Sequence, residues 1–313
     1  MEQRNLGRSG LKVSVVGLGC NNLGRSIDEK GTQALVNQCL DIGITFFDCA
    51  DIYGGKLAEE HLGTALKPRR NEAVLATKVG APLVEGKERS AARHHVIPAV
   101  NDCLRRLKTD RIDLLQIHFP DASTPIEETL RALDDLVRAG KVLYIGCCNY
   151  SATDVVEAAW TAKTAGLTPY ISAQNRHNVL EARISKDMAA SLERHGMGFL
   201  PYYPLAAGLL TGKYRPGMPA APGTRLSVPN RFYDGMLNDK NLANVVKLEK
   251  FAGDRDRSIL ELAIGWLATQ KFIGSVICGA TKPEQVIANA KASTWRLTPE
   301  EMKEVDALLG LPA

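Results

Sequence analysis

The sequence predicts an α/β fold in which eight parallel strands, each followed by a helix, close into a barrel. Strand-like apolar runs alternate with amphipathic helical stretches, and this unit repeats about every 30 residues, as in parallel strand–helix architectures. Eight units are the number that closes such a barrel. A length of 313 residues suits one barrel, so we expect a single domain over residues 1–313.

The eight expected strands are short and nearly continuously apolar, as strands covered on both faces should be. They are expected at residues 13–19, 44–50, 73–79, 112–118, 142–148, 170–175, 198–203 and 274–280. Capping boxes are expected to start helices at residues 26–29, 124–127, 151–154, 258–261 and 298–301. Glycines at positions 43, 140, 166 and 196 are expected to end helices.

Three additions to the barrel are expected. The first dozen residues predict a hairpin that turns on Ser9 and Gly10 and covers the barrel bottom. Residues 205–238 are rich in Gly, Pro and Asn and predict a long functional loop, followed by an extra helix at 239–252. A last helix begins near Thr298. The prediction is therefore a (β/α)8 TIM barrel with an N-terminal β-hairpin, a long loop and extra helix between strands 7 and 8, and a C-terminal extra helix.

Composition and charge exclude several classes of protein. A net charge of +4 is too small to indicate nucleic-acid binding. The seven cysteines form no CxxC and no metal-ligand spacing, which predicts reduced thiols in a cytoplasmic protein without a metal site. The longest uncharged apolar run, 198–212, contains two prolines and is too short to span a membrane. We expect a small-molecule partner; the oligomeric state is left open.

Polar side chains stand where the predicted strands end, which is where barrels of this kind carry their sites. Asp48 ends the second strand with Tyr53 just beyond it, Lys78 ends the third, and His118 ends the fourth. Taken alone, each has an ordinary interpretation as a solvated turn, a surface lysine or a rim histidine. Because all strand ends meet at one mouth, together they predict a site for proton transfer to a polarised oxygen.

At these strand ends the chain resembles the aldo-keto reductases over nearly its full length. The resemblance is carried by FFDCADIYG, ATKVG, LLQIHFPD, GKVLYIGCCNYS, SAQNRHN, YYPLAAGLLTGKY and CGATKPEQV, in the family's order. The residue pattern of the segments RRLKTDRIDLLQIHFPD and TPIEETLRALDDLVRAGKV looks closest to that of a bacterial branch, which includes relatives of potassium-channel β subunits.

The resemblance implies a catalytic tetrad of Asp48, Tyr53, Lys78 and His118. It makes Tyr53 the general acid that protonates a carbonyl oxygen, and His118 the residue that orients that oxygen. The Lys78 ammonium favours a phenolate and should lower the pKa of Tyr53. Asp48 would keep Lys78 charged and act only through it.

The resemblance also implies a nicotinamide cofactor. It assigns the carboxamide to Asn149 and Gln174, and ring stacking to Tyr202. It assigns the pyrophosphate to Leu205, Gly208, Leu210 and Lys213, and the adenosine end to Gly279, Thr281, Lys282, Gln285 and Asn289. Lys282 suits a 2′-phosphate, so NADP (as NADPH) is favoured over NAD. The segment Gly17-Leu18-Gly19 lacks a third glycine, so a Rossmann domain is not supported.

The chain departs from the family pattern at two positions beside the expected cofactor. Cys148 stands where Ser is usual, and a thiol is a weaker hydrogen-bond partner; Tyr203 stands where Ser is frequent. Cys49 is expected to be a small buried packing residue. The substrate pocket is expected to contain Asn21, Asn22, Ile52 and Phe119, with Phe232 and Tyr233 from the long loop.

The leading functional interpretation is an NADP-dependent oxidoreductase that interconverts aldehydes or ketones, sugar-like compounds among them, and alcohols by hydride transfer. The alternative is an NADP-binding regulatory subunit that reports redox state with little turnover. A third interpretation is a lyase or aldolase in which Lys78 forms a Schiff base.

Overall fold

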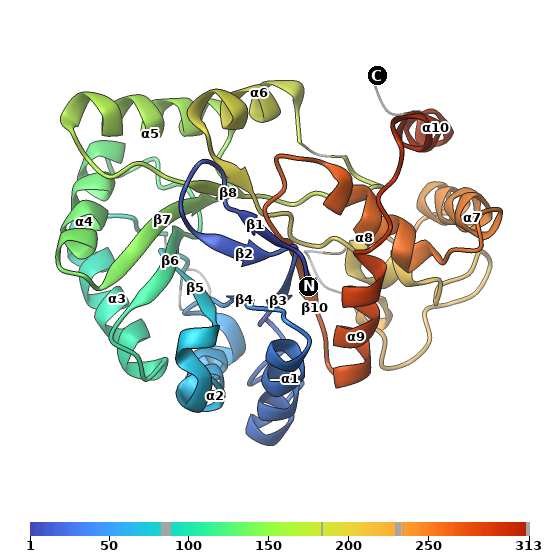
Figure 1. Cartoon of the computed structure of the whole chain (residues 1–313), viewed down its shortest axis with the longest axis horizontal. Helices are drawn as coiled ribbons and strands as arrows, with labels where there is room; N and C mark the ends of the chain where they lie inside the picture. Colours follow the sequence, from blue (N-terminus) through green and yellow to red (C-terminus); the bar gives the residue numbers. More distant parts are fainter. Residues whose placement is uncertain (83–88, 183, 229–232, 234, 311–313) are drawn as a thin grey trace.

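The computed structural model describes residues 1–82, 89–182, 184–228, 233 and 235–310. Its central sheet has eight parallel strands in the order β10-β3-β4-β5-β6-β7-β8-β9, with helices on its outer side (Figure 1). The strands are β3 (Val16–Gly19), β4 (Phe46–Asp48), β5 (Val74–Val79), β6 (Ile112–Ile117), β7 (Val142–Cys148), β8 (Ser172–Gln174), β9 (Gly198–Phe199) and β10 (Val276–Gly279). The predicted α/β barrel of eight parallel strands is confirmed.

The barrel closes between β9 and β10 through individual backbone hydrogen bonds. The Phe199 N–H donates to the Phe272 carbonyl at 2.9 Å, and the Gly274 N–H donates back to the Phe199 carbonyl at 2.9 Å. Further along, the Ile277 N–H donates to the Pro201 carbonyl at 3.2 Å. These bonds occupy backbone groups that would otherwise form an unpaired edge.

The helices follow the predicted order. They are α1 (Glu29–Asp41), α2 (Leu57–Leu66), α3 (Arg93–Arg106), α4 (Ile126–Arg138), α5 (Ala152–Ala165), α6 (Lys186–His195), α7 (Asp239–Gly253), α8 (Ile259–Thr269), α9 (Pro283–Ala292) and α10 (Pro299–Leu309). Short 3₁₀ turns are η1 (Tyr53–Lys56), η2 (Lys67–Glu72), η3 (Ala206–Thr211) and η4 (Arg225–Ser227). The extra helix before the last strand is α7 and the C-terminal addition is α10, as predicted.

Three of the five predicted capping boxes are present. Ser151, Ser258 and Thr298 each accept a hydrogen bond from the third backbone N–H of their helix, and the acidic side chain there bonds back to the cap. Gly166 and Gly196 end α5 and α6 in the left-handed conformation, with φ of 65° and 67°.

The other two predicted caps are wrong. Helix α1 is capped by the side chain of Asp28, two residues after the predicted Ser26. Helix α4 has Pro125 at its N-cap position and no side-chain cap. The Thr124 hydroxyl donates instead to the Asp121 carboxylate at 2.7 Å, because that loop forms its own turn around the carboxylate.

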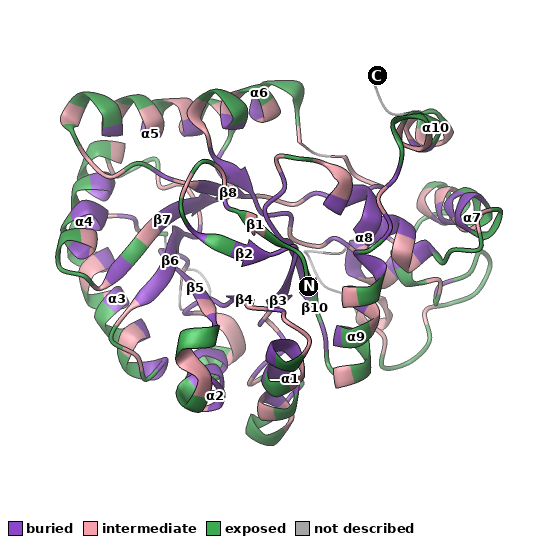
Figure 2. Cartoon of the chain, in the orientation of Figure 1, coloured by how far each residue is buried: buried purple, intermediate pink, exposed green. Residues whose placement is uncertain are grey.

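The N-terminal hairpin plugs the barrel bottom. Strands β1 (Gln3–Asn5) and β2 (Lys12–Ser14) pair antiparallel, so the predicted first strand at 13–19 divides between the hairpin and β3. The hairpin contributes Leu6, Leu11 and Val13 to an apolar cluster with the barrel residues Phe46, Ala76, Leu114, Leu200 and Ile277. Figure 2 shows most of the barrel strands and the inward sides of the helices as buried.

Truncating a buried side chain of the N-terminal hairpin should destabilise the fold without altering the residues at the carboxyl ends of the strands. Leu6 is fully buried, so Leu6→Ala should lower the free energy of unfolding in urea by about 2 to 5 kcal/mol through lost burial and a cavity. Lys12→Ala, on the exposed side of the same hairpin, is the control and should change it little. Equal stability of Leu6→Ala and the unaltered chain would show that the hairpin is not part of the core.

Candidate active site

Alternation along the strands builds two layers of side chains inside the barrel. The lower, apolar layer includes Phe46, Ala76 and Leu114. Two residues further along the same strands stand Asp48, Lys78 and Gln116. Because side chains on one face of a strand recur every second residue, these three point into the barrel above the apolar layer.

Lys78 and Asp48 form a buried ion pair at the mouth end of β5 and β4. The Lys78 Nζ donates to Asp48 Oδ2 at 2.7 Å and to the Cys49 carbonyl at 2.9 Å. Both charged side chains are buried. Removing two charges from water is costly, so this pair is tolerated because short hydrogen bonds satisfy both partners.

Two glutamines complete the partners of the Asp48 carboxylate. Gln116 and Gln174 donate their Nε2 atoms to Asp48 Oδ1 at 3.1 and 2.9 Å. Asp48 therefore organises β6 and β8 as well as Lys78, which corrects the expectation that it acts through Lys78 alone. Gln116 received no role from the sequence, although its inward position in the alternation could have indicated one.

A glycine turn places Tyr53 beside this pair. Gly54 and Gly55 follow it with φ of 56° and 63°, a conformation that glycine adopts at little cost. A Cβ on Gly54 would lie 2.5 Å from the Leu23 carbonyl oxygen, so the turn has no room for a side chain there. The sequence Tyr-Gly-Gly thereby folds the tyrosine back over the strand ends.

Tyr53 and His118 meet over the ion pair. The Lys78 Nζ lies 5.2 Å from the centre of the Tyr53 ring, and the His118 ring meets Tyr53 edge-to-face with centres 6.0 Å apart. The four residues predicted as a tetrad, which include Asp48, are therefore brought together.

Burial and the ion pair set the protonation states. Burial lowers the pKa of Lys78, but attraction to Asp48 outweighs it, so the pKa lies above its ordinary value. Burial raises the pKa of Tyr53 above its ordinary value, and the Lys78 charge lowers it without cancelling that rise. Burial and then Lys78 hold the pKa of His118 well below its usual range. The expected net lowering at Tyr53 is wrong, because desolvation exceeds the attraction of the ammonium.

Asn149 is held in a left-handed conformation, with φ of 63°, just after β7. Its Nδ2 donates to the His118 carbonyl at 2.9 Å and to Cys148 Sγ at 3.3 Å, and its Oδ1 accepts from the Tyr202 hydroxyl at 2.7 Å. Burial raises the pKa of Cys148 to about 12 although Lys78 opposes this, so the thiol stays protonated. Cys148 thus accepts the weak contact that a serine would make more strongly.

Gln174 faces the same side of the mouth as Asn149. Its Nε2 donates to Asp48 and to Gln116, the latter at 3.3 Å. Its Oε1 accepts a weak bond from the Cys148 thiol at 3.9 Å, which leaves one lone pair on that oxygen. The Asn149 Oδ1 also keeps one lone pair. The NH₂ of a nicotinamide carboxamide could donate to these two acceptor oxygens. Asn149 and Gln174 therefore suit the NH₂ side of the carboxamide.

The turn η3 packs against the Lys213 ammonium at Gly208, which has no side chain. Ala206, Ala207 and Gly208 have φ of 47°, 55° and 99°, and a Cβ on Gly208 would lie 2.8 Å from Lys213 Nζ. No carboxylate among the described residues forms an ion pair with Lys213. An ammonium held against a glycine suits a pyrophosphate, and the predicted Leu205 and Leu210 flank it in the same turn.

The start of α9 presents a second cation. Lys282 is exposed at the N-cap position, where helix amides and the helix dipole also favour an anion. The Gln285 Oε1 accepts from the Thr281 N–H at 2.7 Å, which fixes this turn, while Asn289 is buried further along α9. Gly279 ends β10 exposed beside them. The residues present fit a phosphorylated ribose.

The expected substrate residues lie around the same mouth. The Asn22 side chain is engaged at both ends: Nδ2 donates to the Ala280 carbonyl at 3.2 Å, and Oδ1 accepts from Arg225 at 2.9 Å. Asn22 thus tethers the long loop, a contact that the sequence did not indicate. Asn21 lies near Gly279.

The remaining expected substrate residues divide between the tetrad and the long loop. Phe119 stacks on His118, and Ile52 precedes Tyr53. The guanidinium carbon of Arg225 lies 5.8 Å from the centre of the Tyr233 ring, and Phe232 lies outside the described residues.

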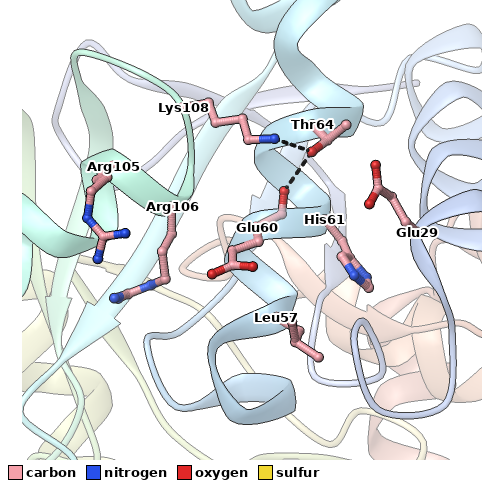
Figure 3. Close-up of a pocket in the computed structure, with 8 residues that line it drawn as sticks. All are labelled: Glu29, Leu57, Glu60, His61, Thr64, Arg105, Arg106 and Lys108. Atoms are coloured by element: carbon pink, nitrogen blue, oxygen red, sulfur yellow. Dashed lines mark hydrogen bonds between the residues drawn. The ribbon is translucent and has the colours of Figure 1, made fainter.

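A pocket of about 400 Å³ lies away from the mouth, on the outer side of the barrel between α1, α2 and α3 (Figure 3). Its lining combines Glu60, Arg105 and Lys108, and the Lys108 Nζ donates to the Thr64 hydroxyl at 2.7 Å. No predicted site residue lines it. Within the described ranges, no three His, Cys, Asp or Glu side chains are grouped to hold a metal ion, and no helix has the length and apolar character to cross a bilayer.

A buried acidic cluster lies behind Lys78. Glu59 accepts from the Thr77 hydroxyl at 2.6 Å and from Arg106 Nε at 2.7 Å. Asp51 is also buried, its N–H donates to the Lys78 carbonyl at 3.1 Å, and its Oδ1 has no partner in the described structure. Burial and then the Glu59 charge raise the pKa of Asp51 to about 7.

Comparison with known proteins gives one family and a consistent set of relatives. The sequence model described as "Aldo/keto reductase family" matches residues 15–309. The chain is 34% identical over 317 residues to a "Probable voltage-gated potassium channel subunit beta" from Oryza sativa subsp. japonica, covering 99% of this chain and 97% of the relative. It is 34% identical over 309 residues to a protein of the same name from Arabidopsis thaliana, covering 93% and 91%. A "Putative voltage-gated potassium channel subunit beta" from Schizosaccharomyces pombe is 34% identical over 322 residues, covering 98% and 92%.

The buried Asp51 should make stability depend on pH. Its folded-state pKa of about 7 exceeds the ordinary value of 3.8, so the folded state binds this proton more tightly and loses stability as pH rises between these values. Asp51→Asn removes that loss. It should raise the free energy of unfolding by about 4 kcal/mol at most at pH 8 and change it little at pH 4. Urea unfolding at several pH values measures it, with the exposed Asp110→Asn as control. A gain that does not grow with pH would contradict the assignment.

Proposed function

The chain belongs to the aldo/keto reductase family, and we propose that it is an NADP-dependent oxidoreductase that interconverts aldehydes or ketones and alcohols by hydride transfer. Family membership by itself supports oxidoreductase chemistry with NAD(P)H in general terms. The observation that carries the finer proposal is the buried Lys78–Asp48 pair directly beside Tyr53 and His118.

Tyr53 is the proton donor in reduction. When bound, a nicotinamide cofactor would supply the hydride for the carbonyl carbon, and the Tyr53 hydroxyl would give its proton to the carbonyl oxygen. The resulting phenolate carries a negative charge next to the Lys78 ammonium, which stabilises it. Asp48 holds that ammonium in place. A raised pKa keeps Tyr53 protonated at neutral pH, as a general acid must be.

His118 orients the carbonyl oxygen. Its lowered pKa keeps the imidazole neutral, so the ring has one N–H donor and one acceptor nitrogen. The backbone fixes it, since the His118 N–H donates to the Val79 carbonyl at 2.8 Å and its own carbonyl accepts from Asn149. A fixed neutral donor places the substrate oxygen without competing with Tyr53 for the proton.

The preference for NADP over NAD rests on the start of α9. Lys282 is exposed there and forms no ion pair with a described carboxylate, so its charge is free for the 2′-phosphate that only NADP carries. Lys213 would serve the pyrophosphate, which both dinucleotides share. The two lysines therefore have separable effects on affinity.

A second candidate function is a regulatory subunit that binds NADP with little turnover. It is favoured by the relatives, which are named as potassium channel β subunits and match this chain over more than 90% of their length. Assay of a panel of simple aldehydes with NADPH separates the two functions. Tight NADPH binding without turnover of any aldehyde would favour the regulatory subunit.

The geometry argues against Lys78 as a Schiff-base nucleophile. Such a lysine must be a neutral amine, whereas Asp48 holds Lys78 as an ammonium with a raised pKa. Borohydride trapping with a carbonyl compound should leave the chain unmodified at Lys78.

Removing the proton donor should abolish reduction while leaving the cofactor in place. Tyr53→Phe deletes one hydroxyl and should lower kcat for aldehyde reduction by about 10²- to 10⁴-fold. NADPH affinity, followed by its fluorescence, should change little. Tyr150→Phe, which removes a buried hydroxyl that belongs to no predicted site, is the control. Retained turnover in Tyr53→Phe would refute its role as acid.

Removing the α9 cation should separate the two dinucleotides. Lys282→Ala should weaken NADPH binding by about tenfold or more, since a charged hydrogen bond is lost, and should leave NADH binding nearly unchanged. Lys291→Ala, exposed at the other end of α9, is the matched control. Equal weakening of both dinucleotides would place the 2′-phosphate elsewhere.

A further inference from the structure

A stack of side chains leads from the catalytic residues to a cation at the rim. The rings of His118 and Phe119 lie parallel within 10°, with centres 4.8 Å apart. The guanidinium carbon of Arg89 lies 4.6 Å from the centre of the Phe119 ring. Phe119 therefore contacts both the histidine of the tetrad and the arginine. The order outward from the tetrad is Tyr53, His118, Phe119 and Arg89.

The backbone next to Arg89 is anchored to the strands that carry the tetrad. The Ser90 N–H donates to the Gly80 carbonyl at 3.3 Å, just after β5. The Ala91 N–H donates to Asp121 Oδ2 at 2.9 Å, two residues after Phe119. The Arg89 position is therefore set by the ends of β5 and β6, the same strands that position Lys78 and His118.

Arg89 has no carboxylate partner among the described residues. Its side chain is exposed, and no carboxylate in the described part of the chain lies within ion-pair distance. Asp121 is close in sequence to Phe119, but both of its oxygens already accept hydrogen bonds, from Ala91, Ser123 and Thr124. The contact with the Phe119 ring is not a hydrogen bond, so it leaves the N–H donors of the guanidinium for a ligand.

Two other cations of the mouth, Lys78 and Arg225, are already engaged. Lys78 pairs with Asp48, and Arg225 donates to Asn22 while lying over the Tyr233 ring at 5.8 Å. Arg89 is thus the guanidinium nearest His118 along this stack that can receive an anion.

We propose that the preferred substrates are carbonyl compounds that carry an acidic group, a carboxylate or a phosphate, and that Arg89 binds this group while the carbonyl lies at Tyr53 and His118. This inference rests on the proposed function and deepens it. A planar guanidinium matches the two oxygens of either anion. Phe119 supplies an apolar wall for the methylene groups between the two ends of the substrate.

Two matched substrate series test the inference by turnover with NADPH. ω-Oxo carboxylates are compared with n-alkanals of the same length, and glyceraldehyde 3-phosphate with glyceraldehyde. The acidic member of a pair should have the lower KM, and Arg89→Ala should raise that KM by about 10- to 100-fold, as expected for loss of a charged hydrogen-bonded pair. Arg89→Lys, which keeps the charge but loses the fork, should lie between them. The pair with the larger effect tells whether the group is a carboxylate or a phosphate.

Matched controls separate this inference from the function on which it rests. Arg93→Ala removes an exposed arginine four residues away, which pairs with Asp135, and should leave both series unchanged. The KM for n-alkanals should be the same in Arg89→Ala and in the unaltered chain. Turnover of alkanals and oxo acids with equal KM, unaffected by Arg89→Ala, would overturn the inference and leave the proposed function standing.

A binding measurement keeps the inference testable if no carbonyl compound is turned over, a result that would refute the proposed function. Hexanoate and hexanamide are titrated by calorimetry into the protein with NADP. Hexanoate should bind about tenfold or more weakly to Arg89→Ala, and hexanamide should be unaffected. Equal loss for both probes, or none, would overturn the role of Arg89.

Discussion

The buried ion pair between Lys78 and Asp48 is the constraint on which the rest of the site depends. Either charge alone at this depth would cost several kcal/mol, so the strands that carry them must keep their register. Gln116 and Gln174 complete the partners of the carboxylate from two further strands. The polar layer therefore spans the barrel interior, above an apolar layer that the N-terminal hairpin closes from below. The catalytic geometry is a property of the closed barrel rather than of any one loop.

The same pair sets the electrostatics of the mouth. Burial and then its ammonium lower the pKa of His118, and the ammonium limits the rise that burial imposes on the pKa of Tyr53. A neutral imidazole and a protonated phenol then lie beside each other, which is the arrangement that the proposed proton transfer requires. Charge that remains free for ligands lies further out, at the exposed cations of the rim. Two sides of the rim differ: Arg225 is tied to Asn22, whereas Arg89 keeps its donors.

Family membership and the names of the relatives point to two uses of one site. The relatives named as channel subunits match the chain along nearly its whole length, so the residues to which we assign the dinucleotide and the proton transfer lie within the shared region. An enzyme and a redox-reporting subunit would differ in how often the hydride is transferred, not in the fold.

The sequence by itself determined the strand and helix order, the hairpin and the extra helices, and it predicted the four residues of the tetrad, which the fold brings together. Apolar runs, capping residues and glycine turns are local signals, and strand ends converge in any closed parallel barrel. A capping signal failed where the side chain had another partner nearby. Thr124 was predicted to cap a helix, but its hydroxyl donates to Asp121 instead. Tertiary structure alone decided the net pKa of Tyr53, the two glutamines on Asp48, and the contrast between Arg225 and Arg89. These depend on burial and on distances between residues far apart in the chain, which no local pattern encodes.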